Sequence, residues 1–428
     1  MAKRYRVYEP DQLFLMPPSL QEWLPEDHLA YFVSDLIDDL DLSEIEAVYE
    51  DEERGQPPYH PHMMVKVLIY AYCSGVFASR RIEKRLVEDV AFRVLAAGNT
   101  PDFRTLSDFR KIHGKAVEGL FEQVLHLARK AGAMKLGRVA IDGSKVKANA
   151  SKHKAMSYGR MKEKERELRE EVQRLLSEAD RQDQAEDRRY GKDQTGEELP
   201  EELRRRESRL ERIRQAKRAL EKEARQAQEA GKEPAQPEDK KQYNFTDPQS
   251  RIMKGSDGFL QGYNCQIAVE ENFQLIVGQG VTQQANDKEQ LKPMVQAIEE
   301  QAGQKPGEVL ADSGYCSEEN LKYLVRRHID GYMATERQKH GGDRTVCKRG
   351  PLPKGAGPVD RMKRKLQTQV GRKIYAMRKA IVEPVFGQIK QARGFRQFLL
   401  RGVEKVQMEW ALVCLTHNIL KLHRIISY

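Results

Sequence analysis

Two aspartates stand directly after short apolar runs, and this placement suits metal-dependent chemistry. The run VAID ends in Asp142, and the run VLAD ends in Asp312. If the two runs form neighbouring strands of one sheet, both carboxylates lie at the same edge. A third acid, Glu383, precedes Pro384, where a helix starts or kinks. Three carboxylates on separate elements predict a site for Mg²⁺ or Mn²⁺, because these hard ions prefer oxygen ligands.

Basic residues lie close in sequence to two of these acids, after Asp142 and on both sides of Glu383. Two divalent ions held by carboxylates can activate a water or hydroxyl and stabilise a leaving oxygen in phosphodiester chemistry. Carboxylates alone repel phosphate, so such a site also needs cations to attract DNA. Lys145 and Lys147 follow Asp142, and Glu383 lies in a basic stretch that contains Arg378, Lys379, Lys390, Arg393 and Arg396.

Each candidate also has a simpler interpretation. Asp-Gly and Asp-Ser-Gly sequences after a strand commonly form turns, and Glu383 could merely neutralise its basic neighbours. His60 and His62 could bind a metal, but histidines at a helix entry are more often polar surface residues. The Gly-rich stretch 341–357 does not match GxxxxGK[ST], so we expect no nucleotide cofactor.

Three stretches closely resemble the acidic motifs of bacterial insertion-sequence transposases of the DDE superfamily: AIDGSKVKANAS, VLADSGYCSEEN and IVEPVFGQIKQARGFRQFLLRG. The helical stretches YHPHMMVKVLIYAYCSGVFASRRIEKRL and TPDFRTLSDFRKIH resemble the N-terminal domain of the same group. This resemblance covers most of residues 15–150 and 244–425. It implies an RNase H-like catalytic domain in which Asp142, Asp312 and Glu383 bind two Mg²⁺ or Mn²⁺ ions.

The spacing around the glutamate departs from the pattern Tyr-x2-Arg-x3-Glu-x6-Lys of many relatives. Tyr375 and Arg378 keep the first interval, and Glu383 and Lys390 keep the last. Four residues, however, separate Arg378 from Glu383, and Lys379 takes the usual offset of the arginine. Which of the two contacts DNA stays open. The set of residues predicted to bind DNA is Lys145, Lys147, Tyr375, Arg378, Lys379, Lys390, Arg393 and Arg396.

The first third of the chain has the periodicity of helices. Apolar residues in PHMMVKVLIYAYCSGV recur at helical spacing, and Pro61 suits a first helical turn. Thr105 with Asp108 resembles an N-terminal capping box. We expect residues 1–132 to form a helical DNA-binding domain. Its segment TLSDFRKIHGKAVEGL either enters a major groove or simply packs inside the domain.

The remainder, residues 133–428, is predicted to be the catalytic domain. Five apolar runs predict strands, GRVAID, GYNCQIAVE, FQLIVGQGVT, GEVLADSGY and GYMAT, of which the second and third form an antiparallel hairpin. Helical segments alternate with the later strands, and a long basic helix near 361–392 precedes a final apolar helix. We therefore expect an α/β (α+β) fold with a mixed five-stranded sheet and flanking helices. The basic residues at 361–373 either follow a DNA backbone or form a solvated helix.

A charged insertion, residues 151–243, interrupts this domain. Two runs carry apolar residues at heptad-like spacing: Leu168, Val172, Leu175 and Ala179, then Leu203, Leu210, Ile213, Leu220, Ala224 and Ala227. The loop GKDQTGEELP between them completes a predicted antiparallel helical hairpin. A solvated spacer is the favoured interpretation, and a specific binding arm is the alternative.

The charge distribution points to nucleic acid as the first partner to consider, with an anionic membrane second. The net charge is +9 and the pI about 9.1. Residues 1–60 hold 15 Asp and Glu against 4 Lys and Arg, whereas residues 337–428 hold 21 Lys and Arg against 5 Asp and Glu. Five scattered cysteines without a CxxC pair argue against a disulfide framework. The sequence lacks an evident signal peptide or membrane span, so we expect a cytoplasmic protein with no membrane partner.

The residues and the resemblance together imply a DNA transposase. Such an enzyme would bind the ends of its element, hydrolyse phosphodiester bonds and transfer the 3′-hydroxyl strand to target DNA. By analogy it would act as a homodimer or a higher synaptic assembly, associated with the nucleoid when bound to DNA. The alternative is a DNA-binding protein without catalysis, such as a repressor or domesticated remnant, and a simple nuclease is a third interpretation.

Overall fold

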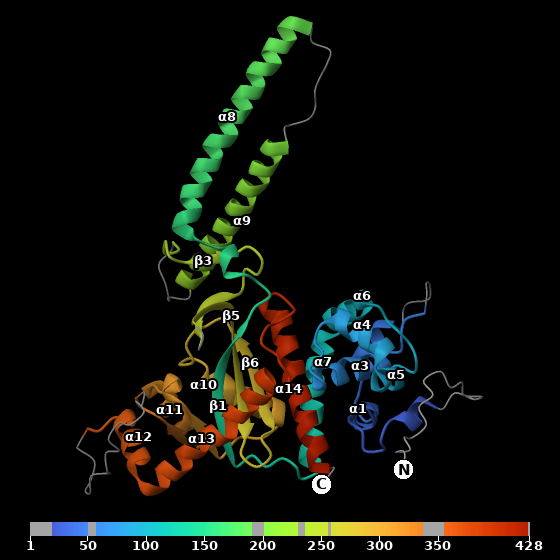
Figure 1. Cartoon of the computed structure of the whole chain (residues 1–428). Helices are drawn as coiled ribbons and strands as arrows, with labels where there is room; N and C mark the ends of the chain where they lie inside the picture. The colour runs from blue at the N-terminus through green and yellow to red at the C-terminus, as the bar shows by residue number, and fades with distance from the viewer. Residues whose placement is uncertain are drawn as a thin grey trace, which may run out of the picture.

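The computed structural model describes residues 19–49, 57–190, 201–229, 236–255, 258–336 and 355–426. A mixed sheet carries helices on its faces, a group of N-terminal helices packs beside it, and a two-helix hairpin projects away from both (Figure 1). The predicted mixed α/β class with a helical N-terminal region is therefore confirmed. The predicted loop at 191–200 and most of the Gly-rich stretch 341–357 lie outside the described residues.

The N-terminal region is built around one buried helix, α3 (Pro61–Cys73). Pro61 opens this helix as predicted, and nearly every residue from Met63 to Cys73 is buried. The surrounding elements are η1 (Leu20–Trp23), α1 (Leu29–Asp38), α2 (Ser43–Glu46), η2 (Ala47–Tyr49), α4 (Ser79–Glu88), α5 (Val90–Leu95), α6 (Phe103–Ile112) and α7 (Gly114–Lys130).

The start of α6 differs from the prediction. The cap is Asp102, whose side chain accepts a hydrogen bond from the Thr105 N–H at 2.7 Å. Thr105 therefore lies inside the first turn, and the predicted Thr105–Asp108 capping box is wrong. The helical stretch also breaks at His113, between α6 and α7. That imidazole is buried, and its Nε2 lies 2.8 Å from the Tyr49 hydroxyl.

The main sheet has the order β4-β5-β1-β7-β8, with β6 beside β5. All five predicted strands are present: β1 (Arg138–Lys147), β5 (Gly258–Glu270), β6 (Ile276–Thr282), β7 (Glu308–Ala311) and β8 (Asp330–Met333). A sixth, the edge strand β4 (Arg251–Gly255), was not predicted because RIMKG is short and its polar and apolar residues do not alternate. β1, β7 and β8 are parallel to one another, whereas β5 runs antiparallel to β1, β4 and β6.

Strand β1 is longer than the run VAID suggested, so Asp142 lies within the strand rather than at its tip. Pairing with β7 stops at Ile141–Ala311, but antiparallel pairing with β5 continues to Lys147–Gly262. Gly262 is needed for this continuation, because a Cβ there would lie 2.3 Å from the carbonyl oxygen of Val146. The polar half of β1 therefore pairs with β5 and no longer with β7, and a parallel bridge joins its last residue, Lys147, to Gln397.

The predicted basic helix at 361–392 is divided into three parts: α12 (Pro358–Gln367), α13 (Gln369–Gly387) and the π-helical segment η5 (Gln388–Ala392). Thr368 separates the first two and caps α13, since its hydroxyl accepts the Gly371 N–H at 3.0 Å. Pro384 lies inside α13, close to the point where the π-helical segment begins. The helices α10 (Leu291–Ala302) and α11 (Glu318–Arg326) complete the set that flanks the sheet.

The last helix, α14 (Val403–Ile426), joins the N-terminal helices to the sheet. It stands between them in Figure 1 and packs against α3, α7 and β6. Trp410, Val413 and Leu415 are fully buried there. One continuous hydrophobic cluster therefore includes α3, α7, α14 and the sheet strands. Within the part of the chain that the structure describes, no helix is long and apolar enough to cross a membrane.

The insertion forms the predicted hairpin of α8 (Tyr158–Tyr190) and α9 (Glu201–Glu229), which run antiparallel in Figure 1. Its base contains η3 (Lys152–Lys154) and the paired short strands β2 (Ala155–Ser157) and β3 (Gln242–Asn244). The hairpin has a small hydrophobic cluster of its own. Most of the predicted heptad residues are buried, namely Leu168, Val172, Leu210, Ile213, Leu220 and Ala224, whereas the side chains of Ala179, Leu203 and Ala227 lie outside the described set.

Candidate active site

Asp142 and Asp312 lie side by side at the point where the inner parallel strands β1 and β7 stop pairing. The last parallel pair between β1 and β7 is Ile141–Ala311, and each aspartate is the next residue of its chain segment. Asp312 then caps η4 (Ser313–Tyr315) by accepting the Gly314 N–H at 2.8 Å. The Asp142 carboxylate accepts the N–H of Gly143, also at 2.8 Å. The register of two parallel strands thus places two partly buried carboxyl groups next to each other.

Arg378 connects this pair to the third acid. It comes from α13, is largely buried, and donates from Nη1 to Asp142 Oδ2 at 3.1 Å. Its Nη2 lies 3.8 Å from Glu383 Oε1. The Tyr375 hydroxyl also bonds with this guanidinium. Glu383 itself is on the open side, with 55% of its side chain exposed. Arg378 rather than Lys379, which is exposed, therefore occupies the acidic cluster.

Burial, together with the neighbouring Asp312, raises the pKa of Asp142 to about 6, although Arg378 and the Gly143 N–H act in the opposite direction. Burial disfavours the charged carboxylate because it removes water from around the charge. The single guanidinium therefore compensates only part of the negative charge that two adjacent aspartates carry at neutral pH. Binding a further cation therefore lowers the electrostatic free energy of a site of this kind.

The donor chemistry fits a hard divalent ion, since the cluster presents only carboxylate oxygens. Within the described ranges, however, no three acidic, histidine or cysteine side chains converge closely enough to enclose an ion. The guanidinium of Arg378 lies between Asp142 and Glu383, where it is the cation that both carboxylates face. Asp142 and Asp312 are thus the two adjacent acids that could hold a metal, and Glu383 is connected to them only through Arg378.

A fourth acid near the cluster, Asp287, was not predicted from the sequence. It lies in the loop between β6 and α10 and accepts hydrogen bonds from Asn264 Nδ2 at 2.7 Å and Gln266 Nε2 at 2.8 Å. The Lys145 ammonium is 3.4 Å away. A Cβ at Gly143 would lie 2.7 Å from Asp287 Oδ1, so the residue after Asp142 must be small for this acid to approach.

The polar pattern of β5 could have indicated this network. Asn264 and Gln266 are fully buried, lie on alternate positions of β5, and pair in register with Lys145 and Gly143. Buried polar side chains need partners, which predicts another polar group nearby. The hydroxyl of buried Tyr315 donates to Gln266 Oε1 and extends the network beneath the two aspartates.

The residues predicted to bind DNA have different surroundings. Lys147, Lys379 and Arg396 are exposed and could meet a phosphate. Lys390 instead points inward, where its ammonium donates to the Ser144 hydroxyl and, at 2.9 Å, to the carbonyl oxygen of Lys145. Lys145 is engaged with Asp287, as described above.

The predicted contact of Arg393 with DNA does not agree with the position of its side chain. Its guanidinium donates to Thr416 Oγ1 at 2.7 Å and to the Val413 carbonyl oxygen at 3.0 Å, both on α14. Burial lowers its pKa to about 10. This arginine is therefore directed into the protein and connects η5 to α14, instead of facing DNA as predicted.

The histidines considered as metal ligands have other partners. His62 lies 3.1 Å from Glu46 Oε1 and 3.4 Å from Asp38 Oδ1 through its two ring nitrogens. His60 caps α3 by accepting the His62 N–H at 3.3 Å. His62 thus connects α3 to α1 and α2, whereas His60 stabilises the start of α3.

Comparison with protein families agrees with this arrangement. A family model described as "Transposase DDE domain" matches residues 137–419, and one described as "Transposase domain (DUF772)" matches residues 18–112. Comparisons with curated proteins and with solved structures gave no significant match. The first model spans the sheet, the hairpin and all three acids, and the mixed sheet is consistent with an RNase H-like DDE domain. The chain therefore belongs to the family of transposases with a DDE domain.

Proposed function

We propose that this transposase binds the ends of its own insertion sequence, cleaves phosphodiester bonds there, and joins the freed 3′-hydroxyl to target DNA. The observation that supports this most directly is the adjacency of Asp142 and Asp312 on β1 and β7, with Glu383 linked to them through Arg378. A protein that only bound DNA would gain nothing from carboxylates at this position, because they repel phosphate.

Asp142 and Asp312 would hold divalent ions, Mg²⁺ or Mn²⁺, with Glu383 completing the ligands from α13. When bound as a pair, such ions lower the pKa of the attacking water or hydroxyl and stabilise the leaving oxygen. The protein's own contribution is positional. The strand register fixes the two aspartates, Arg378 limits their mutual repulsion, and Asp287 with its amide partners supports the strand beneath them.

Exposed cations around the acids would guide the DNA backbone into the site. Lys147 is on β1, Lys379 is on α13 and Arg396 follows η5, and all three side chains are exposed. The helical region, residues 1–132, is proposed to recognise the element ends, and residues 133–428 to perform the chemistry, with 151–243 as an inserted arm. Joining two ends requires two active sites, so we propose a dimer or higher assembly, acting in the cytoplasm at the nucleoid.

The proposal is tested with supercoiled plasmid and end-sequence duplexes in the presence of Mg²⁺. We expect Asp142→Asn, Asp312→Asn and Glu383→Gln each to abolish nicking and strand transfer while DNA binding persists, because each change removes a negative ligand without removing a DNA-facing cation. Glu404→Gln, at an exposed acid outside the cluster, is the matched control and should remain active.

The outcomes separate the candidate functions. Full activity in one of the three variants would exclude that residue from the site. If the wild-type protein binds DNA but shows no Mg²⁺-dependent nicking, the non-catalytic DNA-binding function is favoured instead. Nicked products without joined products would favour a simple nuclease.

A further inference from the structure

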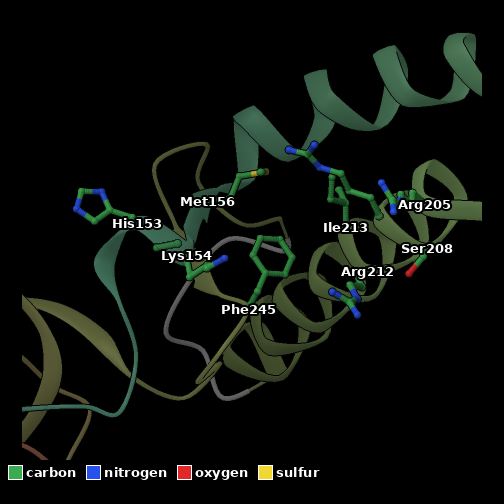
Figure 2. Close-up of a pocket in the computed structure, with 10 residues that line it drawn as sticks. His153, Lys154, Met156, Arg205, Ser208, Arg212, Ile213 and Phe245 are labelled. Carbon is green, nitrogen blue, oxygen red and sulfur yellow. The ribbon is translucent and has the colours of Figure 1, made fainter. Parts of the chain in front are cut away.

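An open cavity of about 690 Å³ lies at the base of the helical hairpin, away from the acidic cluster. One wall is α9, which contributes Arg209 and Arg212, and the other wall is η3, which contributes His153 and Lys154. Figure 2 shows Phe245 between Lys154 on one side and the α9 residues on the other. No residue that lines this basic groove is acidic.

The basic residues of α9 that face α8 differ from two that line the groove. Those directed at α8 are paired with its carboxylates: Arg206 with Glu171 at 3.0 Å, and Arg214 and Lys217 with Glu165 at 3.3 and 3.0 Å. In contrast, Arg209 and Arg212 are exposed and have no acidic partner among the residues that the structure describes. The hairpin is thus held together by neutralised pairs, while Arg209 and Arg212 leave positive charge exposed along the groove.

The floor of the groove is apolar. Phe245 is half-buried and packs with Met156 against the small hydrophobic cluster of the hairpin. The Phe245 N–H donates to the Lys154 carbonyl oxygen at 3.0 Å, which fixes the floor to the η3 wall. Cations around an apolar, partly aromatic floor are the combination that binds a phosphate backbone and the sugar or base surface beside it.

The position of the groove connects it with the active site. The chain passes from Asp142 along β1, through the exposed Lys147, and then directly into η3. Eleven residues from Asp142 to His153 span at most roughly 40 Å. That distance corresponds to roughly 12 base pairs of duplex, at about 3.4 Å each. The groove therefore lies within about that length of duplex from the acids.

We infer that this groove binds the phosphodiester backbone of DNA at a distance from the bond that is cleaved. The inference rests on the proposed function only in taking DNA as the polymer, and it requires no catalysis. Because phosphate contacts carry no sequence information, the groove adds affinity for any DNA that extends past the active site. The hairpin is then a clamp for the DNA backbone and not a passive spacer.

The test measures binding of the full-length protein to a fluorescein-labelled duplex by anisotropy over a range of salt concentrations. For Arg209→Glu/Arg212→Glu we expect affinity at low salt to fall about tenfold or more. The slope of log K against log salt should decrease by about 2, since about one counterion is released per phosphate contact. Lys154→Glu, on the opposite wall, should lower the slope by about 1.

The matched control is Arg218→Glu/Lys222→Glu, which makes the same charge change on the exposed opposite face of α9. It should leave the slope unchanged. Equal losses in the control would show a general charge effect, and unchanged binding in the groove variants would show that DNA does not use this surface; either result overturns the inference. Altered self-association with unaltered DNA binding would also overturn it, in favour of an acidic protein partner. The variants alter only exposed side chains, and circular dichroism checks that the helices are retained.

A nicking assay distinguishes the two proposals. If Asp142→Asn stops cleavage but keeps the wild-type salt slope, DNA binding in the groove does not depend on catalysis at the acids. If the wild-type protein never nicks DNA yet loses affinity in the groove variants, the proposed function fails and the groove inference stands.

Discussion

At the scale of single residues, the acidic cluster depends on which side chain of α13 faces the sheet. Arg378 and Lys379 are neighbours in sequence, but only Arg378 reaches Asp142 and Glu383, whereas Lys379 is exposed. The identity of the acids could be predicted from sequence, because a carboxylate after an apolar strand is visible in the pattern. The choice between the two cations could not, because it depends on where α13 begins and how the helix is rotated.

Replacing Arg378 tests whether its charge competes with a divalent ion. In Arg378→Gln, the positive charge beside Asp142 is lost, so the carboxylates should bind Mn²⁺ about tenfold or more tightly, as measured by calorimetric titration. Nicking should nevertheless fall, because the guanidinium also positions Asp142. Lys379→Gln removes the same charge from an exposed neighbour and should change Mn²⁺ affinity much less. Equal effects of the two variants would contradict a special role for Arg378.

At the scale of elements, the secondary structure predicted from sequence was wrong where tertiary contacts override the local sequence pattern. The second half of β1, from Gly143 to Lys147, has a polar sequence, but it remains a strand because β5 supplies buried Asn264 and Gln266 opposite it. The basic helix divides at Thr368 because this residue caps α13. Short β4 has no strong alternation, and it is a strand because β5 provides a partner.

The π-helical segment explains why Arg393 was assigned wrongly. A π-helix changes the rotation of side chains relative to an α-helix, and here η5 directs Arg393 toward α14. We expect Arg393→Gln to lower the free energy of unfolding by about 2–4 kcal/mol, because buried acceptors on α14 lose a charged donor. DNA affinity at a temperature where the variant is folded should be unchanged.

The comparison for this prediction is Arg396→Gln, an exposed residue of the same segment. It should show the reverse pattern, with little loss of stability and weaker DNA binding. Denaturant unfolding and anisotropy give the two quantities. Weaker DNA binding by Arg393→Gln at unchanged stability would restore the original prediction for this residue.

At the scale of the whole molecule, α14 is the element that makes one core from the N-terminal helices and the sheet. Its apolar residues were visible in the sequence, but its buried polar residues are equally important to its position. Glu409 accepts the N–H groups of Leu399 and Leu400 at 2.9 and 3.0 Å, and the Tyr72 hydroxyl at 3.2 Å. Sequence cannot assign such partners, because Tyr72 is 337 residues from Glu409, and the two backbone N–H groups, although only 9 and 10 residues away, leave no mark in the sequence.

The same helix predicts a pH dependence of stability. Burial lowers the pKa of His417 to about 3, and Arg393, Lys421 and Arg424 act in the same direction, while a hydrogen bond with the Gln274 carbonyl oxygen at 3.0 Å opposes them. The unfolded chain, with a histidine pKa near 6.5, takes up a proton below that pH that the folded chain does not.

The contribution of neutral His417 to the free energy of unfolding should therefore be fully present above about pH 6.5. Below that pH it should fall by about 1.4 kcal/mol per pH unit. In His417→Gln, which can still donate to Gln274, the loss between pH 7 and pH 4.5 should be smaller by about 2–3 kcal/mol than in the wild type. His126→Gln, at an exposed histidine, should follow the wild-type curve. Urea unfolding at both pH values measures the difference. Parallel curves for His417→Gln and the wild type would mean that this imidazole is not held neutral in the core, and that α14 packs against the sheet less tightly than its burial implies.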